Sequence, residues 1–123
     1  MTTSTFASRL RAMFTRNRDD STLGSSVSAA RAVELVRDGA ALIDVRESQE
    51  WKAGHAPQAI HVPLAKIDTA PRRLSANTQV LVVCASGLRS RTGAKKLRDA
   101  GFDAASVSGG MTAWEQSGGA VRR

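Results

Sequence analysis

The sequence predicts an α/β fold, in which helices cover a parallel β-sheet. From Val27 onward, segments with helical spacing of apolar residues alternate with short extended runs, a pattern typical of this class. Residues 80–83 are continuously apolar, as expected for a central parallel strand that is buried on both faces. The length of 123 residues suits a single domain that buries roughly two-thirds of the surface its unfolded chain exposes.

The first half of the domain is predicted to hold one helix, two strands and a helical turn between the strands. Ser28 is a good N-cap residue, and Gly39 is a suitable helix stop. The apolar runs that follow are short enough to be strands. The predicted elements are a helix at residues 28–38, a strand at 41–45, a helical turn at 47–53 and a strand at 59–62.

The second half is predicted to start with a less regular stretch at residues 64–77, with one helical turn and a loop. The clearest strand then leads directly into Cys84. Gly101 ends the next helix, and the pair Gly109–Gly110 turns the chain into a closing helix. The predicted elements are a strand at 80–83, a helix at 90–100, a strand at 105–107 and a helix that contains Trp114.

We divide the chain into a flexible basic N-terminal arm at residues 1–26, a domain at 27–118 and a C-terminal tail at 119–123. The arm has no acidic residue before Asp19. Its composition favours a solvated arm, but its apolar residues have helical spacing, which also suits a basic amphipathic helix on a membrane or a partner. An organelle transit peptide has a similar composition. These apolar residues are Phe6, Leu10, Met13 and Phe14.

The net charge of +7 suits an anionic partner, namely a small anionic substrate, an anionic membrane or a nucleic acid. An aromatic fraction of 4% without tyrosine disfavours nucleic acid, because single-strand binding relies on aromatic stacking. A single cysteine excludes an intrachain disulfide and favours a cytoplasmic location. We expect no metal, because His55 and His61 lack partners at metal-ligand spacing; His55 is interpreted as ordering its turn by hydrogen bonding.

Cys84 is the candidate reactive residue. It follows the central strand, at the edge of the sheet where open α/β proteins form their sites. Gly87 allows the loop to turn its N–H groups inward, and the next helix adds its partly positive N-terminus. These groups and Arg89 favour a thiolate. The alternative is a buried, inert cysteine.

Six segments together carry a pattern that resembles the rhodanese family. Each segment alone has little specificity, but their order and spacing follow the family from residue 27 to about 117. The segments are Leu42-Ile-Asp-Val-Arg46, Glu50-Trp51, Gly54-His55, Ala59-Ile-His-Val-Pro63, Cys84-Ala-Ser-Gly-Leu-Arg-Ser90, and Gly109-Gly110-Met111 with Trp114.

The resemblance implies a five-stranded parallel sheet with helices on both faces and a sulfurtransferase that needs no cofactor. Cys84 is then the residue that carries sulfur as a persulfide. Asp44, Arg46 and Glu50 are expected to shape the active loop, with Arg46 paired to Glu50. The remaining loop residues are expected to bind substrate: Ala85, Ser86, Gly87, Leu88, Arg89 and Ser90.

The expected reaction moves a sulfane sulfur from a small anionic donor, such as thiosulfate or another persulfide donor, to cyanide, a thiol or a sulfur-carrier protein. Ala85 and Ser86 stand where many thiosulfate-using relatives have a basic residue, which disfavours thiosulfate. A phosphatase or arsenate reductase is disfavoured, because only four residues separate Cys84 from Arg89, one fewer than those enzymes have. A docking or sensing module without catalysis is the other alternative.

Overall fold

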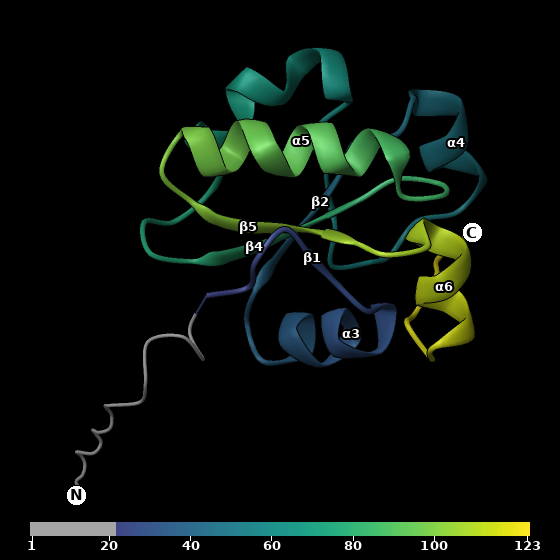
Figure 1. The fold of residues 1–123 in the computed structure, drawn as a ribbon. Coiled ribbons are helices and arrows are strands. Elements are labelled where there is room, and N and C mark those ends of the chain that lie inside the picture. The colour runs from purple at the N-terminus through teal and green to yellow at the C-terminus, as the bar shows by residue number, and fades with distance from the viewer. Residues whose placement is uncertain (1–21) are drawn as a thin grey trace, which may run out of the picture.

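The sheet at the centre of the molecule is wholly parallel. The computed structural model describes residues 22–123 of the chain. In this part, five strands lie in the order β1-β5-β4-β2-β3 (Figure 1). The predicted α/β class is thereby confirmed. The strands are β1 (Ser26–Val27), β2 (Ala41–Asp44), β3 (Ile60–His61), β4 (Gln79–Val83) and β5 (Asp103–Val107).

Helices cover both faces of the sheet. In Figure 1, α5 and the 3₁₀ helix η1 lie on one side, whereas α3 and α6 lie on the other. The buried apolar residues accordingly form two clusters, one on each face. The helices are α3 (Ala29–Arg37), α4 (Ser48–Ala53), η1 (Leu64–Arg73), α5 (Leu88–Asp99) and α6 (Gly110–Gln116).

The position of β4 in the sheet explains why residues 80–83 are continuously apolar. Val80 and Val82 pack in the cluster under α5, whereas Leu81 and Val83 pack in the cluster over α3 and α6. All four side chains are fully buried. A strand that is covered on both faces has no position that favours a polar side chain.

The segments that follow β2, β4 and β5 lie next to one another at the carboxyl edge of the sheet. Because β2 and β5 flank β4 in parallel register, the residues that follow these strands emerge side by side. The N–H of Val45 donates to Val83 O at 3.0 Å, which continues the pairing to the end of β4. Cys84 therefore starts its loop between the ends of two neighbouring strands.

The predicted arm boundary after residue 26 is too late. Ser26 belongs to β1 and pairs with Ser106, and the N–H of Leu23 donates to Asp103 Oδ1 at 3.0 Å. A two-residue edge strand is too short to give a sequence pattern, which is why it escaped prediction. Residues 1–21, with the predicted amphipathic segment, lie outside the described part.

The predicted C-terminal tail is also part of the domain. Arg122 and His55 form an antiparallel bridge in which each N–H donates to the other's carbonyl, at 2.7 and 3.0 Å. Trp114 Nε1 donates to Ala120 O at 2.9 Å, which satisfies a buried indole. These contacts join the predicted tail at residues 119–123 to α6 and to the start of the β3 connection. Among residues 22–123, no helix has the length and apolarity that crossing a membrane requires.

Candidate active site

The sulfur of Cys84 lies inside a ring of hydrogen-bond donors. Its Sγ accepts from the N–H of Gly87 at 3.0 Å and from the N–H of Ser90 at 3.3 Å, and Ser90 Oγ lies 3.5 Å away. The residue is 1% exposed. The amides come from the loop and the first turn of the 12-residue helix α5, where helical N–H groups lack intrahelical partners.

The hydrogen bonds favour the thiolate form of Cys84. Burial raises the pKa of the thiol, because it penalises a charge. The Ser90 hydroxyl and the amides of Ser90, Gly87 and Ser86 together outweigh burial, so that the pKa lies below its usual value. A lower pKa increases the fraction of thiolate at neutral pH, and the thiolate is the nucleophilic form of cysteine.

Two glycines shape the loop around this sulfur. Gly87 caps α5 with a φ of 109°, a left-handed conformation that glycine adopts without strain. Gly110 starts α6 and packs directly on the loop: a Cβ there would lie 2.3 Å from Ala85 O and 2.4 Å from Cys84 O. The N–H of Met111 donates to Cys84 O at 2.8 Å. The start of α6 therefore forms one wall of the loop.

The other loop residues lie at its mouth. Ala85 is half-buried and Ser86 is exposed. Leu88 is 69% exposed, which is unusual for a leucine in a domain with this core. These three side chains are the ones that a molecule approaching the loop would meet first.

Arg89 joins the loop to α4. Its two terminal nitrogens bind the two carboxylate oxygens of Glu50, each at 2.8 Å. The Arg89 guanidinium lowers the pKa of Glu50 to about 2, and Glu50 in turn raises the pKa of Arg89 above its usual value. Glu50 Oε1 also accepts the N–H of Glu47 at 2.9 Å. A half-exposed bidentate pair thus fixes the loop against the first turn of α4.

Arg46 and Glu50 do not pair with each other, so the predicted pair is wrong. Arg46 instead binds Asp44, with Nη2 2.8 Å from Oδ2, and its Nη2 also donates to Gly54 O at 2.8 Å. Asp44 is fully buried at the end of β2, so a charge beside it is needed to balance its own. Glu50 lies across from the loop instead, within reach of Arg89.

A stack of aromatic rings joins α4 to the residues that follow it. The ring of Trp51 stacks on His55 at a centroid distance of 3.6 Å and on His61 at 4.7 Å. His55 Nδ1 bonds Trp51 O at 2.8 Å, consistent with its predicted role in the turn, and His61 Nε2 bonds Arg46 O at 2.7 Å. No role for His61 is predictable from the sequence, because its partner is 15 residues away.

Ser106 is the site residue that the sequence analysis missed. It lies on β5, is 1% exposed, and its Oγ is 2.7 Å from Ser90 Oγ. Its only sequence signal is a hydroxyl among the apolar residues Ala104, Ala105 and Val107 of β5. That signal points to a buried hydrogen bond but does not name the partner.

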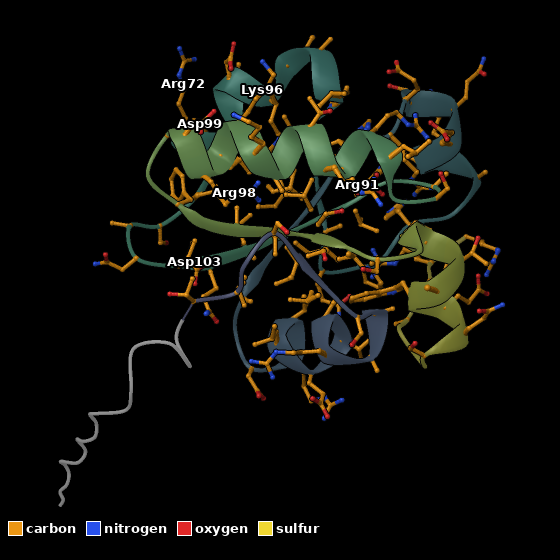
Figure 2. The ribbon with its side chains drawn as sticks, in the orientation of Figure 1. Arg72, Arg91, Lys96, Arg98, Asp99 and Asp103 are labelled. Atoms are coloured by element: carbon orange, nitrogen blue, oxygen red, sulfur yellow. The ribbon has the colours of Figure 1, made fainter. Side chains whose placement is uncertain are left out.

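The basic side chains of α5 mostly lie away from the loop. Lys95 pairs with Asp99 at 3.1 Å, and Figure 2 shows Lys96 and Asp99 toward the far end of the helix, near Arg72. Arg91 is closer to the loop. Charge from α5 therefore reaches the loop mainly through Arg89.

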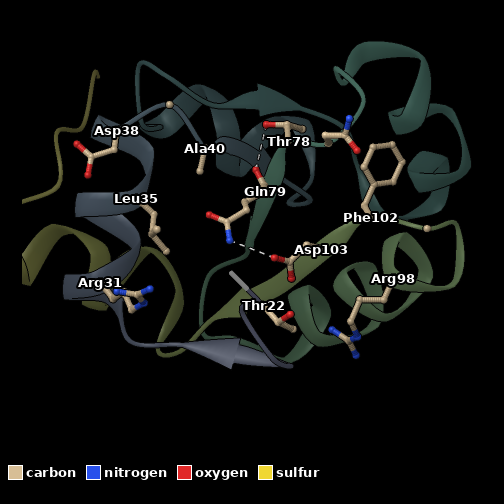
Figure 3. A pocket seen from close by; sticks show the side chains of 13 residues that line it. Thr22, Arg31, Leu35, Asp38, Ala40, Thr78, Gln79, Arg98, Phe102 and Asp103 are labelled. Atoms are coloured by element: carbon tan, nitrogen blue, oxygen red, sulfur yellow. Dashed lines mark hydrogen bonds between the residues drawn. The ribbon is translucent and has the colours of Figure 1, made fainter. Parts of the chain in front are cut away.

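A cavity of about 190 Å³ lies between α4 and α6; Arg46, Glu50, Met111 and Arg123 are among its lining residues. A groove of about 970 Å³ lies at the opposite edge of the sheet (Figure 3). In the described part of the chain, no three His, Cys, Asp or Glu side chains gather at metal-binding distances.

Comparisons with known proteins agree with this geometry. A family model described as "Rhodanese-like domain" matches residues 28–117. The chain is 40% identical over 74 residues to the "Putative sulfurtransferase YtwF" of Bacillus subtilis (strain 168), covering 60% of this chain and 72% of that protein. Its fold is similar to a rhodanese-related protein from Thermoplasma volcanium, with a TM-score of 0.71, 28% identity and coverage of 80% and 97% of the two chains. It is also similar to CoADR-RHD from Bacillus anthracis, with a TM-score of 0.69 and 25% identity, but it spans only 17% of that chain.

Proposed function

The chain belongs to the rhodanese-like domain family, and on that basis we propose that it is a sulfurtransferase in which Cys84 carries the sulfur. One observation supports this most: at the end of a buried strand, two backbone amides and a hydroxyl converge on one sulfur atom. Such a ring stabilises a thiolate before the reaction.

The proposed reaction is a double displacement. The Cys84 thiolate attacks the outer sulfur of the donor, a sulfur–sulfur bond forms, and the donor's remaining part leaves with the electron pair of the bond that breaks. With thiosulfate the leaving group is sulfite. The acceptor nucleophile then attacks the outer sulfur of the persulfide, and the thiolate leaves with its electron pair. Cyanide as the acceptor gives thiocyanate.

The mouth of the loop favours donors other than thiosulfate. Ala85 and Ser86 bring no charge to the entrance, and Arg89 is already paired with Glu50. Thiosulfate carries two negative charges and needs more compensating positive charge than a thiol persulfide or mercaptopyruvate. The entrance supplies little such charge. We propose a persulfide donor and a thiol or a sulfur-carrier protein as acceptor, in the cytoplasm.

Turnover with a panel of substrates tests the proposal. Thiocyanate release from cyanide should be measured with thiosulfate, mercaptopyruvate and glutathione persulfide as donors, and hydrolysis of an aryl phosphate should be measured in parallel. We expect turnover with at least the persulfide, none with the phosphate ester, and complete loss in Cys84→Ser. Ala85→Arg should increase the thiosulfate rate. Phosphate hydrolysis that depends on Cys84 would favour a phosphatase instead, and no activity with any substrate would favour a docking module.

A further inference from the structure

Ser106 is a buried hydroxyl behind the reactive sulfur. Its side chain points to the face of the sheet that α5 covers, the face that also receives Ala104. There its Oγ lies 2.7 Å from Ser90 Oγ. Burying a hydroxyl costs free energy unless it is hydrogen-bonded, so this contact explains how a serine is accommodated in a buried strand.

Three atoms form a chain from the strand to the sulfur: Ser106 Oγ, Ser90 Oγ and Cys84 Sγ. The second step, from Ser90 Oγ to Sγ, is 3.5 Å long. Ser90 has a single hydroxyl proton but two neighbours that can accept it. Whether Cys84 Sγ or Ser106 Oγ receives this proton depends on whether Ser106 donates its own proton to Ser90 Oγ.

When Cys84 is a thiolate, one arrangement satisfies every donor. The anionic sulfur accepts only, so Ser90 donates its proton to Sγ. Ser90 Oγ then accepts the proton of Ser106. Both buried hydroxyl protons have acceptors, and the chain of donors ends on the negative charge.

The reverse chain leaves one donor without an acceptor. If the Cys84 thiol donates to Ser90 Oγ, Ser90 donates to Ser106 Oγ, and the proton of Ser106 must find a third partner. Within residues 22–123, the Ser106 hydroxyl has the Ser90 hydroxyl as its hydrogen-bond partner. An unsatisfied buried donor is costly, so the pair of serines prefers the arrangement that ends on an anion.

We propose that Ser106 is a positioning residue: its hydroxyl donates to Ser90 Oγ and thereby holds the Ser90 proton on the sulfur of Cys84. The residue acts through Ser90 and does not itself touch the sulfur. This inference deepens the proposed function, because the thiolate it stabilises is the proposed sulfur acceptor.

The charged groups around Cys84 stay the same when Ser106 changes. They are Arg89 at the start of α5, its partner Glu50 on α4, and the pair of Asp44 and Arg46 at the end of β2. None of them bonds Ser106. A change in the titration of Cys84 in a Ser106 variant therefore reports on the hydroxyl chain.

Direct titration of the thiolate by ultraviolet absorbance tests the proposal. The chain has one cysteine and no tyrosine, so no tyrosinate signal overlaps. We expect Ser90→Ala to raise the pKa of Cys84 by about 1 unit and Ser106→Ala to raise it by about 0.5 to 1 unit. The double variant should match Ser90→Ala, because without Ser90 the proton of Ser106 no longer reaches the sulfur. Ser26→Ala is the matched control: this exposed serine is in register with Ser106 on β1, and its loss should leave the pKa unchanged.

Two outcomes would overturn the proposal: an unchanged pKa in Ser106→Ala, or a Ser106→Ala shift that persists in the Ser90→Ala background. The titration uses no sulfur donor, so it stands even if sulfur transfer is not observed. If Ser106→Ala does not fold, hydroxyl-proton NMR of the wild-type protein replaces it. The signal of the Ser106 hydroxyl should then shift as Cys84 titrates, and a signal that does not move would contradict the chain.

Discussion

The two edges of the sheet use their polar groups in different ways. At the edge where β4 and β5 begin, a groove of about 970 Å³ is open, but two of its polar side chains bind one another: Asp103 accepts from Gln79 Nε2 (Figure 3). Asp103 also accepts from Leu23 N. At the edge where β4 ends, the space is small, yet amides and a hydroxyl converge on Cys84. The reactive site is therefore marked by donors that converge on one buried atom, and the volume of a cavity is a poor guide to it.

The carboxyl edge also contains the buried pair of Asp44 and Arg46, and its loss should have the largest effect on stability. In Asp44→Asn, the buried Arg46 loses its counterion, so we expect the free energy of unfolding to fall by about 3 to 5 kcal/mol. Urea unfolding measures this change. Asp99→Asn, which breaks the exposed pair with Lys95, is the control and should cost less than about 1 kcal/mol. Equal costs for the two variants would contradict the structural importance of the buried pair.

Alanine variants of two glycines with positive φ, Gly110 and Gly101, distinguish the effect of backbone strain from the effect of a clash with the active loop. A methyl group in Gly110→Ala would clash with the carbonyls of Ala85 and Cys84, so we expect the loop to shift and the sulfur-transfer rate to fall about 100-fold. Gly101→Ala adds a methyl group in open space at the other edge of the sheet. It should cost about 1 kcal/mol of stability and leave the rate unchanged.

Steady-state rates of both folded variants decide this comparison. A similar loss of rate in Gly101→Ala would mean that strain anywhere in the domain, rather than the contact between Gly110 and the loop, controls the chemistry.

The pair of Glu50 and Arg89 should affect the rate more than the stability. Half-exposed pairs contribute only about 0 to 1 kcal/mol, but this one fixes the loop against α4. We expect Arg89→Ala and Glu50→Gln each to lower the rate about tenfold, and the double variant to be no worse than either. Arg123→Ala, which breaks the exposed pair with Glu115, should leave the rate unchanged. Additive losses in the cycle would show that the two residues act separately.

The same pair gives the smallest expected effect, a loss of stability in acid. The pKa of Glu50 is lowered from 4.5 to about 2 in the folded protein, so its carboxylate favours folding above pH 4.5. This contribution disappears as the pH falls through about 2. Wild type should therefore lose more stability than Glu50→Gln between these values, as measured by urea unfolding at a series of pH values. Parallel curves would show that the pair contributes nothing to folding.

The regular parts of the fold were predictable because their patterns are local. The apolar run of β4, the N-cap Ser28 and the helix after Cys84 each follow from periodicity or capping. The predicted helix began two residues late, because a left-handed glycine cap at Gly87 leaves no side-chain signal. The 3₁₀ helix at Leu64–Arg73, which has a kink at Lys66 and Pro71 inside, has no clear period to read.

The site was predictable only in part, because its remaining contacts join distant residues. The position of Cys84 at a strand end and of Gly87 in its loop is local information. The partner of Arg89 is not local, because Glu50 lies 39 residues away. The partner of Arg46, Asp44, lies only two residues back, but the spacing does not show that Arg46 turns to Asp44 rather than to Glu50. Ser106 and the segment around Arg122 likewise depend on how elements meet in three dimensions.

The central claim is that Cys84 carries sulfur, and intact mass measurement tests it most directly. After incubation with a persulfide donor and removal of excess donor, the wild-type protein should gain about 32 Da, the mass of one sulfur atom. Cys84→Ser should gain nothing, and cyanide should return the loaded wild type to its original mass. An unchanged mass with every sulfane donor in the folded protein, or an equal gain in Cys84→Ser, would contradict the account.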